Sequence, residues 1–412
     1  MFTSFSTALS ALGAHATAVD VVGNNLANLN TPGFKASAVS FADLVTQSLG
    51  AGLGETQVGF GVGRPTTLRQ FSQGAIQSSS GPLDAAIQGD GFLVVQNQAG
   101  QQLYTRGGNL IVDKSGNLLT AKNYRVLGWS AGADGTVDTN GPIGNIVIPV
   151  GTLRAPVAST GFNFDLNLNA AAAPGDRFST SIEVFDSLGV SHIITVNFTR
   201  STTANQWDYS ISVPDADVNT PIPPVTGSLT FNSAGVLTTP APTDAPPELN
   251  ITGLVSGAAD MTLRWALYNN GIPRLTQYAQ PSAVSANSQN GSPAAQLIRV
   301  GLADGGQVLA QYSNGQQIVV GQLAMASIRN PESLVAVGDN NYQLSARSAL
   351  PAIGRPGTGG RGTILGGAVE SSTVDIAREF TNLIVLQRGY QANTRVITTV
   401  DEISQETINL KR

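Results

Sequence analysis

Histidine is scarce in this chain, and its two copies stand in segments of different kinds. His15 lies between apolar positions of a helix-like segment, whereas His192 shares one face of a strand-like segment with apolar residues. A Ser/His/Asp triad or a histidine metal site needs the imidazole and its partners to be brought together. We therefore interpret both histidines as packing or surface residues. The chain has no Cys, which excludes disulfides and thiolate metal ligands.

The other residues capable of chemistry form no recognisable site. Asp401 and Glu402 are an adjacent acidic pair on a predicted helix, where a solvated face or a contact between subunits is their ordinary role. The glycine-rich stretch Gly59–Arg64 (GFGVGR) has neither GxGxxG nor Walker A spacing, so we predict a β-turn or bulge there. We expect no catalytic, cofactor-binding or metal-binding residues, and a protein that is not an enzyme.

The length and the charge of the chain limit the classes of protein to which it can belong. The 412 residues predict two to four domains, and they carry 12% charged side chains, a formal net charge of −5 and no Lys/Arg cluster. Nucleic acids and anionic membrane surfaces attract concentrated positive charge, so we expect neither as a partner. The first basic residue is Lys35, and no uninterrupted run approaches about 18 apolar residues. We expect no membrane insertion, and an exterior location would need a secretion route that reads an uncleaved N-terminus.

Both ends of the chain show helical periodicity. Large apolar residues recur there at spacings of three and four. The N-terminal stripe is Phe2, Phe5, Leu9, Leu12, Val19 and Leu26, and the C-terminal stripe is Ile376, Phe380, Leu383, Tyr390, Ile397, Val400, Ile403 and Leu410. Thr373 is the expected N-cap of the second helix. Because little between the stripes is helical, we expect the two helices to pair as a coiled coil and to contact neighbouring chains.

The interior of the chain alternates apolar and polar residues, as half-buried strands do. The clearest segments are residues 178–184, 194–198, 207–213 and 261–267. Pro-rich residues 214–226 and 239–247 indicate loops, and residues 354–367, with seven Gly, indicate a flexible connection. Turn signals at this density predict two antiparallel β-sandwich or barrel domains, one nested in the other. The expected fold class is therefore multidomain α+β.

Two stretches resemble the paired terminal signatures of the bacterial flagellar rod and hook family. They are NNLANLNTPGFK (Asn24–Lys35) and LQRGYQANTRVITTVDEISQETINLKR (Leu386–Arg412). The family's first signature reads roughly N-x-x-A-N-x-x-T-x-G-[FY]-[KR], and it is met by Asn25 or Asn24, Ala27, Asn28, Thr31, Gly33, Phe34 and Lys35. The second signature is carried by Gln387, Tyr390, Gln391, Ala392 and Asn393. The chain departs from it at Gly389, where relatives usually carry Ala.

The middle of the chain resembles the hook branch of this family. Rod subunits lack a large insert, whereas residues 147–285 supply about 140 residues, and Ile182–Phe198 resembles the start of the hook-type insert. Resemblance and segment pattern together predict a division of the chain into four parts. These are a coiled-coil domain at 1–30 and 371–412, connecting segments at 31–70 and 359–370, a first β-domain at 71–146 and 286–358, and an inserted outer β-domain at 147–285.

The resemblance implies a structural subunit that polymerises with itself into the flexible tubular hook, the universal joint that transmits motor torque to the filament. It also implies contacts with the distal rod protein, the hook cap, the hook–filament junction protein and the flagellar type III export apparatus. The expected location is the extracellular hook of the basal body, reached without a cleaved signal peptide. Two alternatives stay open: a distal rod subunit of the basal body, and a secreted β-rich adhesin or surface-layer protein. The second alternative explains the low charge and the hairpins but not the two terminal signatures.

Overall fold

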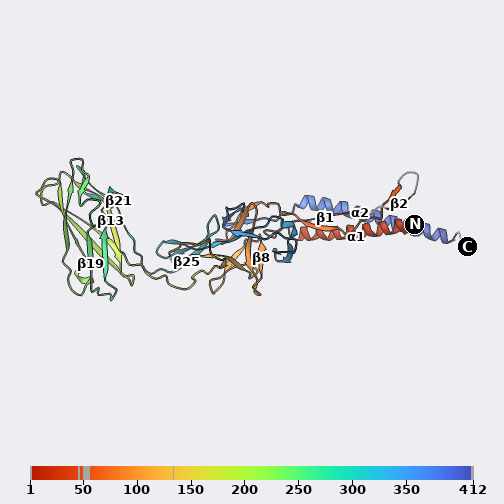
Figure 1. Cartoon of the computed structure of the whole chain (residues 1–412), viewed down its shortest axis with the longest axis horizontal. Helices are drawn as coiled ribbons and strands as arrows, with labels where there is room; N and C mark the ends of the chain where they lie inside the picture. Colours follow the sequence, from red (N-terminus) through yellow and green to blue (C-terminus); the bar gives the residue numbers. More distant parts are fainter. Residues whose placement is uncertain (1, 45–46, 50–55, 133, 410–412) are drawn as a thin grey trace. The chain divides into compact units, whose positions relative to one another are not determined.

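The structure is a computed structural model that describes residues 2–44, 47–49, 56–132 and 134–409. These residues form two compact units. Unit 1 comprises residues 1–150, 299–311 and 317–412, and unit 2 comprises residues 151–298 and 312–316. The described chain is mostly β-structure, with one long helix towards each end (Figure 1).

Unit 1 contains both helices, α1 (Phe2–Ala27) and α2 (Ile376–Asn409). Its strands before the insertion are β1 (Ser37–Ser40), β2 (Gln47–Leu49), β3 (Thr56–Val58), β4 (Thr66–Arg69), β5 (Ile76–Ser78), β6 (Ala85–Gln88), β7 (Phe92–Gln96), β8 (Gln102–Thr105), β9 (Leu110–Val112), β10 (Leu118–Thr120), β11 (Arg125–Ser130) and β12 (Gly144–Asn145). The strands after the insertion are β25 (Leu297–Leu302), β26 (Gln307–Tyr312), β27 (Gln317–Leu323), β28 (Met325–Ser327), β29 (Val335–Gly338), β30 (Asn341–Gln343), β31 (Ala352–Gly354), β32 (Thr363–Gly366) and β33 (Ala368–Glu370).

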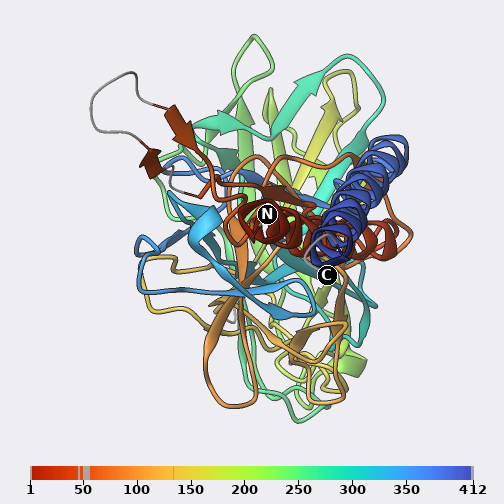
Figure 2. The same ribbon diagram turned by 90° about the vertical axis from the view of Figure 1, so that its right-hand side faces the viewer.

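Small side chains form the buried face of helix α1. The buried residues recur at helical spacing and are Ala8, Ala11, Ala14, Ala18, Val22 and Asn25. Helix α1 contacts α2 and β1, and Figures 1 and 2 show α1 (red) and α2 (blue) side by side. After Ala27 the chain leaves the helix, and Gly33 has a φ of +72°, a conformation that glycine adopts without strain.

Helix α1 also has the length and composition of a membrane span, although it contains no uninterrupted apolar run of that length. Its segment Ser4–Ala27 has a mean hydropathy of 1.2. A core helix of a soluble protein and a signal sequence meet the same criterion. The property therefore reflects a helix rich in Ala, Val and Leu with few charges, and it does not assign α1 to a membrane.

Helix α2 starts after Asp375, which caps it. The Oδ1 atom of Asp375 accepts the backbone N–H of Arg378 at 3.1 Å, and its charge suits the positive end of the helix dipole. The predicted cap at Thr373 is wrong, because that hydroxyl instead accepts the N–H of Ala36 at 2.9 Å. Thr373 thus ties the segment that follows α1 to the segment that precedes α2.

The largest sheet of unit 1 has 13 strands, and its main path runs β25-β26-β27-β11-β7-β8-β30-β29. Phe92 and Tyr342 are buried on it, and the ring of Phe71 meets both edge-on, with centroid distances of 5.5 and 5.2 Å. Two smaller pairs, β32–β6 and β33–β5, bind the residues just before α2. The prediction of a flexible connection at 354–367 is therefore wrong in its second half, which forms strand β32.

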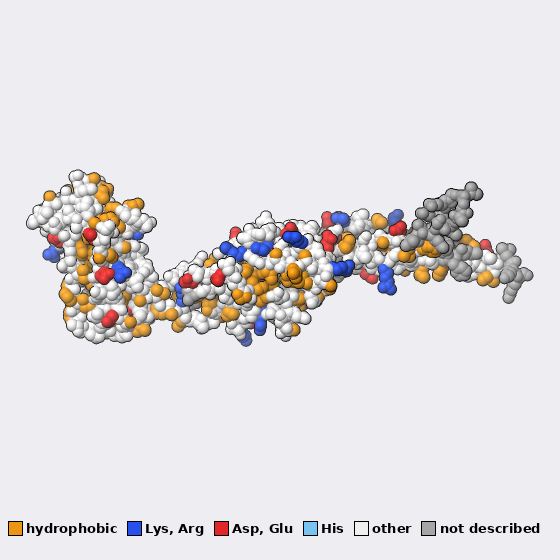
Figure 3. All heavy atoms as spheres, viewed as in Figure 1, with side chains coloured by type: hydrophobic (Ala, Val, Ile, Leu, Met, Phe, Trp, Pro, Cys, Tyr) orange, Lys and Arg blue, Asp and Glu red, His pale blue; other side chains and the backbone are white. Residues whose placement is uncertain are grey.

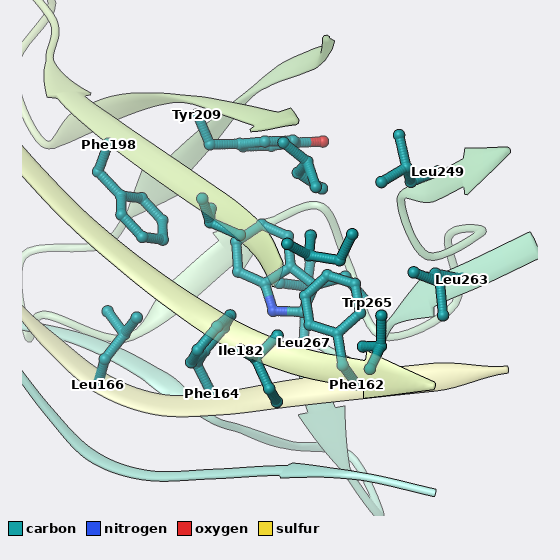
Figure 4. Packing of buried hydrophobic residues seen from close by; sticks show 14 of the residues in the cluster. Phe162, Phe164, Leu166, Ile182, Phe198, Tyr209, Leu249, Leu263, Trp265 and Leu267 are labelled. Carbon is teal, nitrogen blue, oxygen red and sulfur yellow. The ribbon is translucent and has the colours of Figure 1, made fainter. Parts of the chain in front are cut away.

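Unit 2 contains two five-stranded sheets. Its strands are β13 (Gly161–Asn169), β14 (Arg177–Phe185), β15 (Ser191–Arg200), β16 (Gln206–Ser212), β17 (Val225–Phe231), β18 (Leu237–Thr239), β19 (Glu248–Ile251), β20 (Met261–Trp265), β21 (Tyr268–Asn269), β22 (Ile272–Pro273), β23 (Leu275–Tyr278) and β24 (Ala283–Gln289). The strands predicted from alternation are confirmed as β14, β15, β16 and β20. One apolar cluster contains residues of both sheets, among them Phe164, Phe198 and Trp265 (Figure 4).

Strand β13 departs from the predicted antiparallel arrangement. It pairs in parallel with β20 and β23 and antiparallel with β24, so the prediction of purely antiparallel sheets is wrong here. Parallel neighbours need a long crossover, and the chain completes the whole β14–β18 sheet between β13 and β20. The Pro-rich loops are confirmed, except that β17 begins at Val225 and a single 3-10 turn spans Asp215–Asp217.

Candidate self-assembly site

The predicted apolar stripes divide between a packed side and an open side of the helix pair. Six of the stripe residues are half-buried: Leu12, Val19, Leu26, Leu383, Ile397 and Val400. Six others are exposed: Phe5, Leu9, Ile376, Phe380, Tyr390 and Ile403. The side chain of Phe2 and the whole of Leu410 lie outside the described residues. Apolar side chains therefore stand on the surface of both helices, where orange marks them in Figure 3.

The α1–α2 contact is close enough to exclude a side chain at one position. A Cβ atom added to Gly389 of α2 would lie 2.7 Å from Cε1 of His15 of α1. The His15 ring also tilts against Phe41, at a centroid distance of 5.6 Å. His15 is therefore a packing residue, as its position among apolar residues indicates. It occupies the space that the family's usual Ala would take.

Asn25, a residue of the N-terminal signature stretch, joins three parts of unit 1. Its amide Nδ2 donates to the carbonyl oxygen of Ser37 at 2.8 Å and to Oε1 of Glu379 at 3.3 Å. Its Oδ1 accepts the N–H of Ser37 at 3.0 Å. Asn25 is completely buried, and a buried amide with its groups satisfied holds its partners in one arrangement. The signature thus fixes α1 to β1 and to the first turn of α2.

Lys35, the last residue of that signature, is buried in an ion network. Its Nζ donates to the carbonyl oxygen of Ser72 and to Oε1 of Glu370, both at 2.6 Å. Glu370 also accepts the N–H of Gly74 at 2.7 Å, and its Oε2 lies 3.4 Å from Nη1 of Arg106. Burial lowers the pKa of Lys35, while its hydrogen bond to Glu370 opposes that shift. The network joins the start of the β-structure to the strand just before α2.

Gly33 and Phe34 complete the same junction. A Cβ atom at Gly33 would lie 2.6 Å from the carbonyl oxygen of Arg106, so no side chain fits there. The N–H of Gly33 donates to the carbonyl oxygen of Glu370 at 2.7 Å. Phe34 is buried with Val374 in a small cluster of its own. The family's Gly and aromatic positions therefore have a packing reason in this fold.

The remaining signature residues lie nearer the surface. The Thr31 hydroxyl donates to Oδ1 of Asn28 at 3.1 Å in the turn after α1. Asn393 is half-buried and its Nδ2 donates to the carbonyl oxygen of Gly389 at 2.9 Å. The exposed members are Ala27, Gln387, Tyr390, Gln391 and Ala392. The structure thus brings the N-terminal signature into one junction, but it leaves most of the C-terminal signature open to solvent.

The acidic partners of this junction, Glu370 and Glu379, were not predicted from the sequence. Each is a single carboxylate close to apolar residues, and each is at least nine-tenths buried. A lone acidic residue on an apolar face is the signal that indicates a buried pair, because unpaired carboxylates are seldom buried. Their partners come from positions more than 260 residues away in the sequence, which no local pattern identifies.

In unit 2 the second histidine is buried between two carboxylates. Nε2 of His192 lies 3.2 Å from Oδ2 of Asp186, and Nδ1 lies 3.0 Å from Oδ2 of Asp217. Burial acts to raise the pKa of Asp186, but hydrogen bonds from Ser256, from the N–H of Val190 and from His192 outweigh it and hold that pKa below its ordinary value. The Ser256 hydroxyl bonds the carboxylate and not the imidazole, so this is not the arrangement of an activated nucleophile.

No metal centre accompanies these groups in the described part of the chain. Among the described residues, no group of three or more His, Asp and Glu side chains could hold a metal ion. Asp186 and Asp217 approach His192 from opposite ring nitrogens, so their oxygens do not converge on one point. The cluster ties the turn between β14 and β15 to the 3-10 turn at Asp215–Asp217.

Four segments of the chain match known protein families. Residues 5–35 match the flagella basal body rod protein family, and residues 86–162 match the flagellar hook protein FlgE/F/G D1 domain. Residues 163–292 match the flagellar basal body protein FlaE D2 domain. Residues 365–410 match the C-terminal family of the flagellar basal body rod proteins FlgEFG. The matches include most of α1, all of α2 and parts of both units.

The chain is also similar to complete proteins over its whole length. It is 33% identical to the flagellar hook protein FlgE of Escherichia coli (strain K12) over 422 residues, covering 99% of this chain and 100% of that protein. It is 30% identical to the FlgE of Treponema pallidum (strain Nichols) over 468 residues, covering 100% of both chains. The crystal structure of the Helicobacter pylori flagellar hook protein FlgE2 is similar in fold, with a TM-score of 0.54 and 16% identity over 70% of this chain and 99% of that one.

Proposed function

The chain belongs to the bacterial flagellar hook protein family as a structural subunit of the hook, and we propose that the exposed faces of α1 and α2 are the surface through which it polymerises. The exposure of large apolar side chains on these helices carries the proposal. Leu9 and Phe380 are 55% and 52% exposed, while the small residues Ala14 and Ala18 are buried. Burying a large apolar side chain contributes about 1.5–3 kcal/mol, which another copy of the chain can supply.

We propose a coiled coil for the helix pair and a nested sandwich for unit 2. The coiled coil is supported by the α1–α2 contact and by the spacing of three and four among the buried residues of α1 and among the half-buried residues of α2. The sandwich is supported by the single apolar cluster that both sheets of unit 2 share. The proposed division keeps the coiled coil at 1–30 and 371–412, connecting segments at 31–70 and 359–370, a first β-domain at 71–146 and 286–358, and the insert at 147–285.

The proposed partners follow from the family. They are other copies of the chain, the distal rod protein, the hook cap, the hook–filament junction protein and the flagellar type III export apparatus. The proposed role is mechanical and not enzymatic, in the extracellular hook. Export is proposed to leave the N-terminus intact, so N-terminal sequencing of the chain recovered from assembled hooks should begin at Met1 or Phe2. A start inside α1 contradicts uncleaved export.

A charge on the open face of α2 tests the assembly surface. We expect the wild-type chain to form tubes visible by electron microscopy and Phe380→Asp to abolish them, because a carboxylate cannot be buried against another subunit without a large cost. The free energy of unfolding of the monomer should change by less than about 0.5 kcal/mol, since the side chain is exposed there. Ile272→Asp, at a 69% exposed residue of unit 2, is the matched control and should still form tubes. Normal tubes from Phe380→Asp contradict the proposal.

A further inference from the structure

A cavity of about 300 Å³ opens in unit 1 where α1, β1 and the first turns of α2 meet. Apolar side chains line much of it, namely Val21, Val22, Val39, Phe41 and Val385. Two carboxylates also line it, Asp375 and Glu379, both from the start of α2. The cavity therefore combines apolar walls with two carboxylates and one arginine, Arg378.

Glu379 is buried at this cavity with half of its carboxylate unsatisfied. Its side chain is 8% exposed, and Oε1 accepts the Nδ2–H of Asn25 at 3.3 Å. Its Oε2 is buried and has no hydrogen-bond partner among the described residues. A buried carboxylate oxygen ordinarily has a partner, because leaving it unpaired forfeits its hydration without compensation. The geometry therefore points to a donor that the described part of a single chain does not supply.

We propose that this cavity receives the guanidinium group of an arginine from α2 of a second copy of the chain. The inference rests on the proposed polymerisation through the helices. An arginine matches the cavity because its aliphatic stem packs on apolar walls while its head pairs with a carboxylate. Arg378 and the positive end of the helix dipole, which amounts to roughly half a charge, oppose a cation there, and the two carboxylates outweigh them.

Besides Arg378 in its first turn, helix α2 carries two arginines that can present this group to another copy, Arg388 and Arg395. Both are exposed, and they stand seven residues apart, so they occupy equivalent positions on one helix face. Neither forms an ion pair with any residue that the structure describes. Arg388 lies next to the exposed apolar residues Ile384 and Val385, which belong to the proposed assembly surface. The same contact that covers this apolar face can therefore deliver the guanidinium.

The test measures the critical concentration for elongation of sheared polymer seeds, at low and high salt. Glu379→Gln removes the charge and keeps an acceptor for Asn25. It should raise the critical concentration about tenfold at low salt and reduce the salt dependence, as for loss of a partly desolvated charge pair. Glu402→Gln, an exposed carboxylate further along α2, is the matched control and should change it less than about twofold.

A double-mutant cycle identifies the donor. With either Arg388→Gln or Arg395→Gln, the double variant with Glu379→Gln should polymerise no worse than the weaker single variant. The inference is overturned by either of two results: Glu379→Gln behaving like Glu402→Gln, or additivity with both arginine variants.

Arg378 also lines the cavity, so its own chain offers a competing donor. If the effects of Arg378→Gln and Glu379→Gln on the free energy of unfolding of the monomer are not additive, Glu379 pairs with Arg378 of its own chain. That result would overturn the inference. Absence of such coupling, together with coupling in the polymer, supports it. Failure of the wild-type chain to elongate seeds would instead overturn the proposed function itself.

Discussion

The terminal helices and unit 2 differ in how far they bury their large apolar side chains. In unit 2, Trp207, Trp265 and Phe164 are at most 1% exposed and meet inside one cluster. In the helices, Leu9 and Phe380 are more than half exposed. A segment that buries its largest side chains completes its own core, whereas one that buries alanine and exposes leucine and phenylalanine has a surface for another chain. The two regions thus separate self-contained folding from assembly.

The largest expected effect comes from removing a large side chain from the core of unit 2, which tests whether unit 2 folds independently of the helices. Trp265→Ala should lower the stability of unit 2 by about 3–5 kcal/mol, the cost of removing a large buried aromatic side chain. Hydrogen exchange of the full chain should then accelerate in β16 and β20, while exchange in α2 stays as in the wild type. Equal acceleration in α2 would show that the helices depend on the core of unit 2.

A second substitution tests the junction that anchors the helices to unit 1. Lys35→Met leaves Glu370 with Arg106, at 3.4 Å, as its one cationic partner among the described residues, and should cost about 3 kcal/mol, the low end for breaking a buried ion pair. Urea unfolding of unit 1 measures the loss. Lys122→Met is the matched control, because Lys122 is exposed and lies 3.8 Å from Asp339 in a surface pair. Such pairs contribute about 0–1 kcal/mol, so a similar loss in both variants would refute the buried role of Lys35.

Acidification should affect unit 2 through Asp186. The pKa of Asp186 is held below its ordinary value in the folded chain, so the folded state favours the ionised form. The stability that this contributes is present above the ordinary value of 3.8 and is lost as pH falls through the lower folded value. The urea concentration at which half of unit 2 is unfolded should therefore decrease when the pH is lowered below about 4. Asp186→Asn should be less stable at pH 7 and lose less on acidification, and an unchanged pH dependence would contradict this assignment.

The sequence predicts the helices and the alternating strands because their patterns are local. Leu383 and Ile397 carry the 3.6-residue period, and strands β14–β16 carry the two-residue period. The parallel pairing of β13 has no such local signal, since it depends on a crossover of about 100 residues. The Asn25–Glu379 and Lys35–Glu370 contacts likewise join distant residues. The periodicity also could not tell which side of α1 is packed, because alanines fit a close helix contact better than the larger residues that define the stripe.

The smallest expected effect concerns Gly389, where the resemblance to the family leads us to expect Ala. Glycine within a helix costs about 1 kcal/mol relative to alanine, so Gly389→Ala should favour α2 locally. However, the new Cβ would lie 2.7 Å from Cε1 and 3.0 Å from Nε2 of His15, and the ring would have to shift. We therefore expect Gly389→Ala alone to be neutral or destabilising by up to about 1 kcal/mol.

Removing the ring should invert the sign of this effect. In a His15→Ala background the space beside residue 389 opens, so Gly389→Ala should stabilise the helix pair by about 0.5–1 kcal/mol. Unfolding followed by the helical circular dichroism of the full chain gives the four free energies of this double-mutant cycle. An interaction near zero would mean that His15 and Gly389 do not pack against each other. A clear interaction would show that His15 and Gly389 form one packing unit, in which the histidine ring requires a residue without a side chain at position 389.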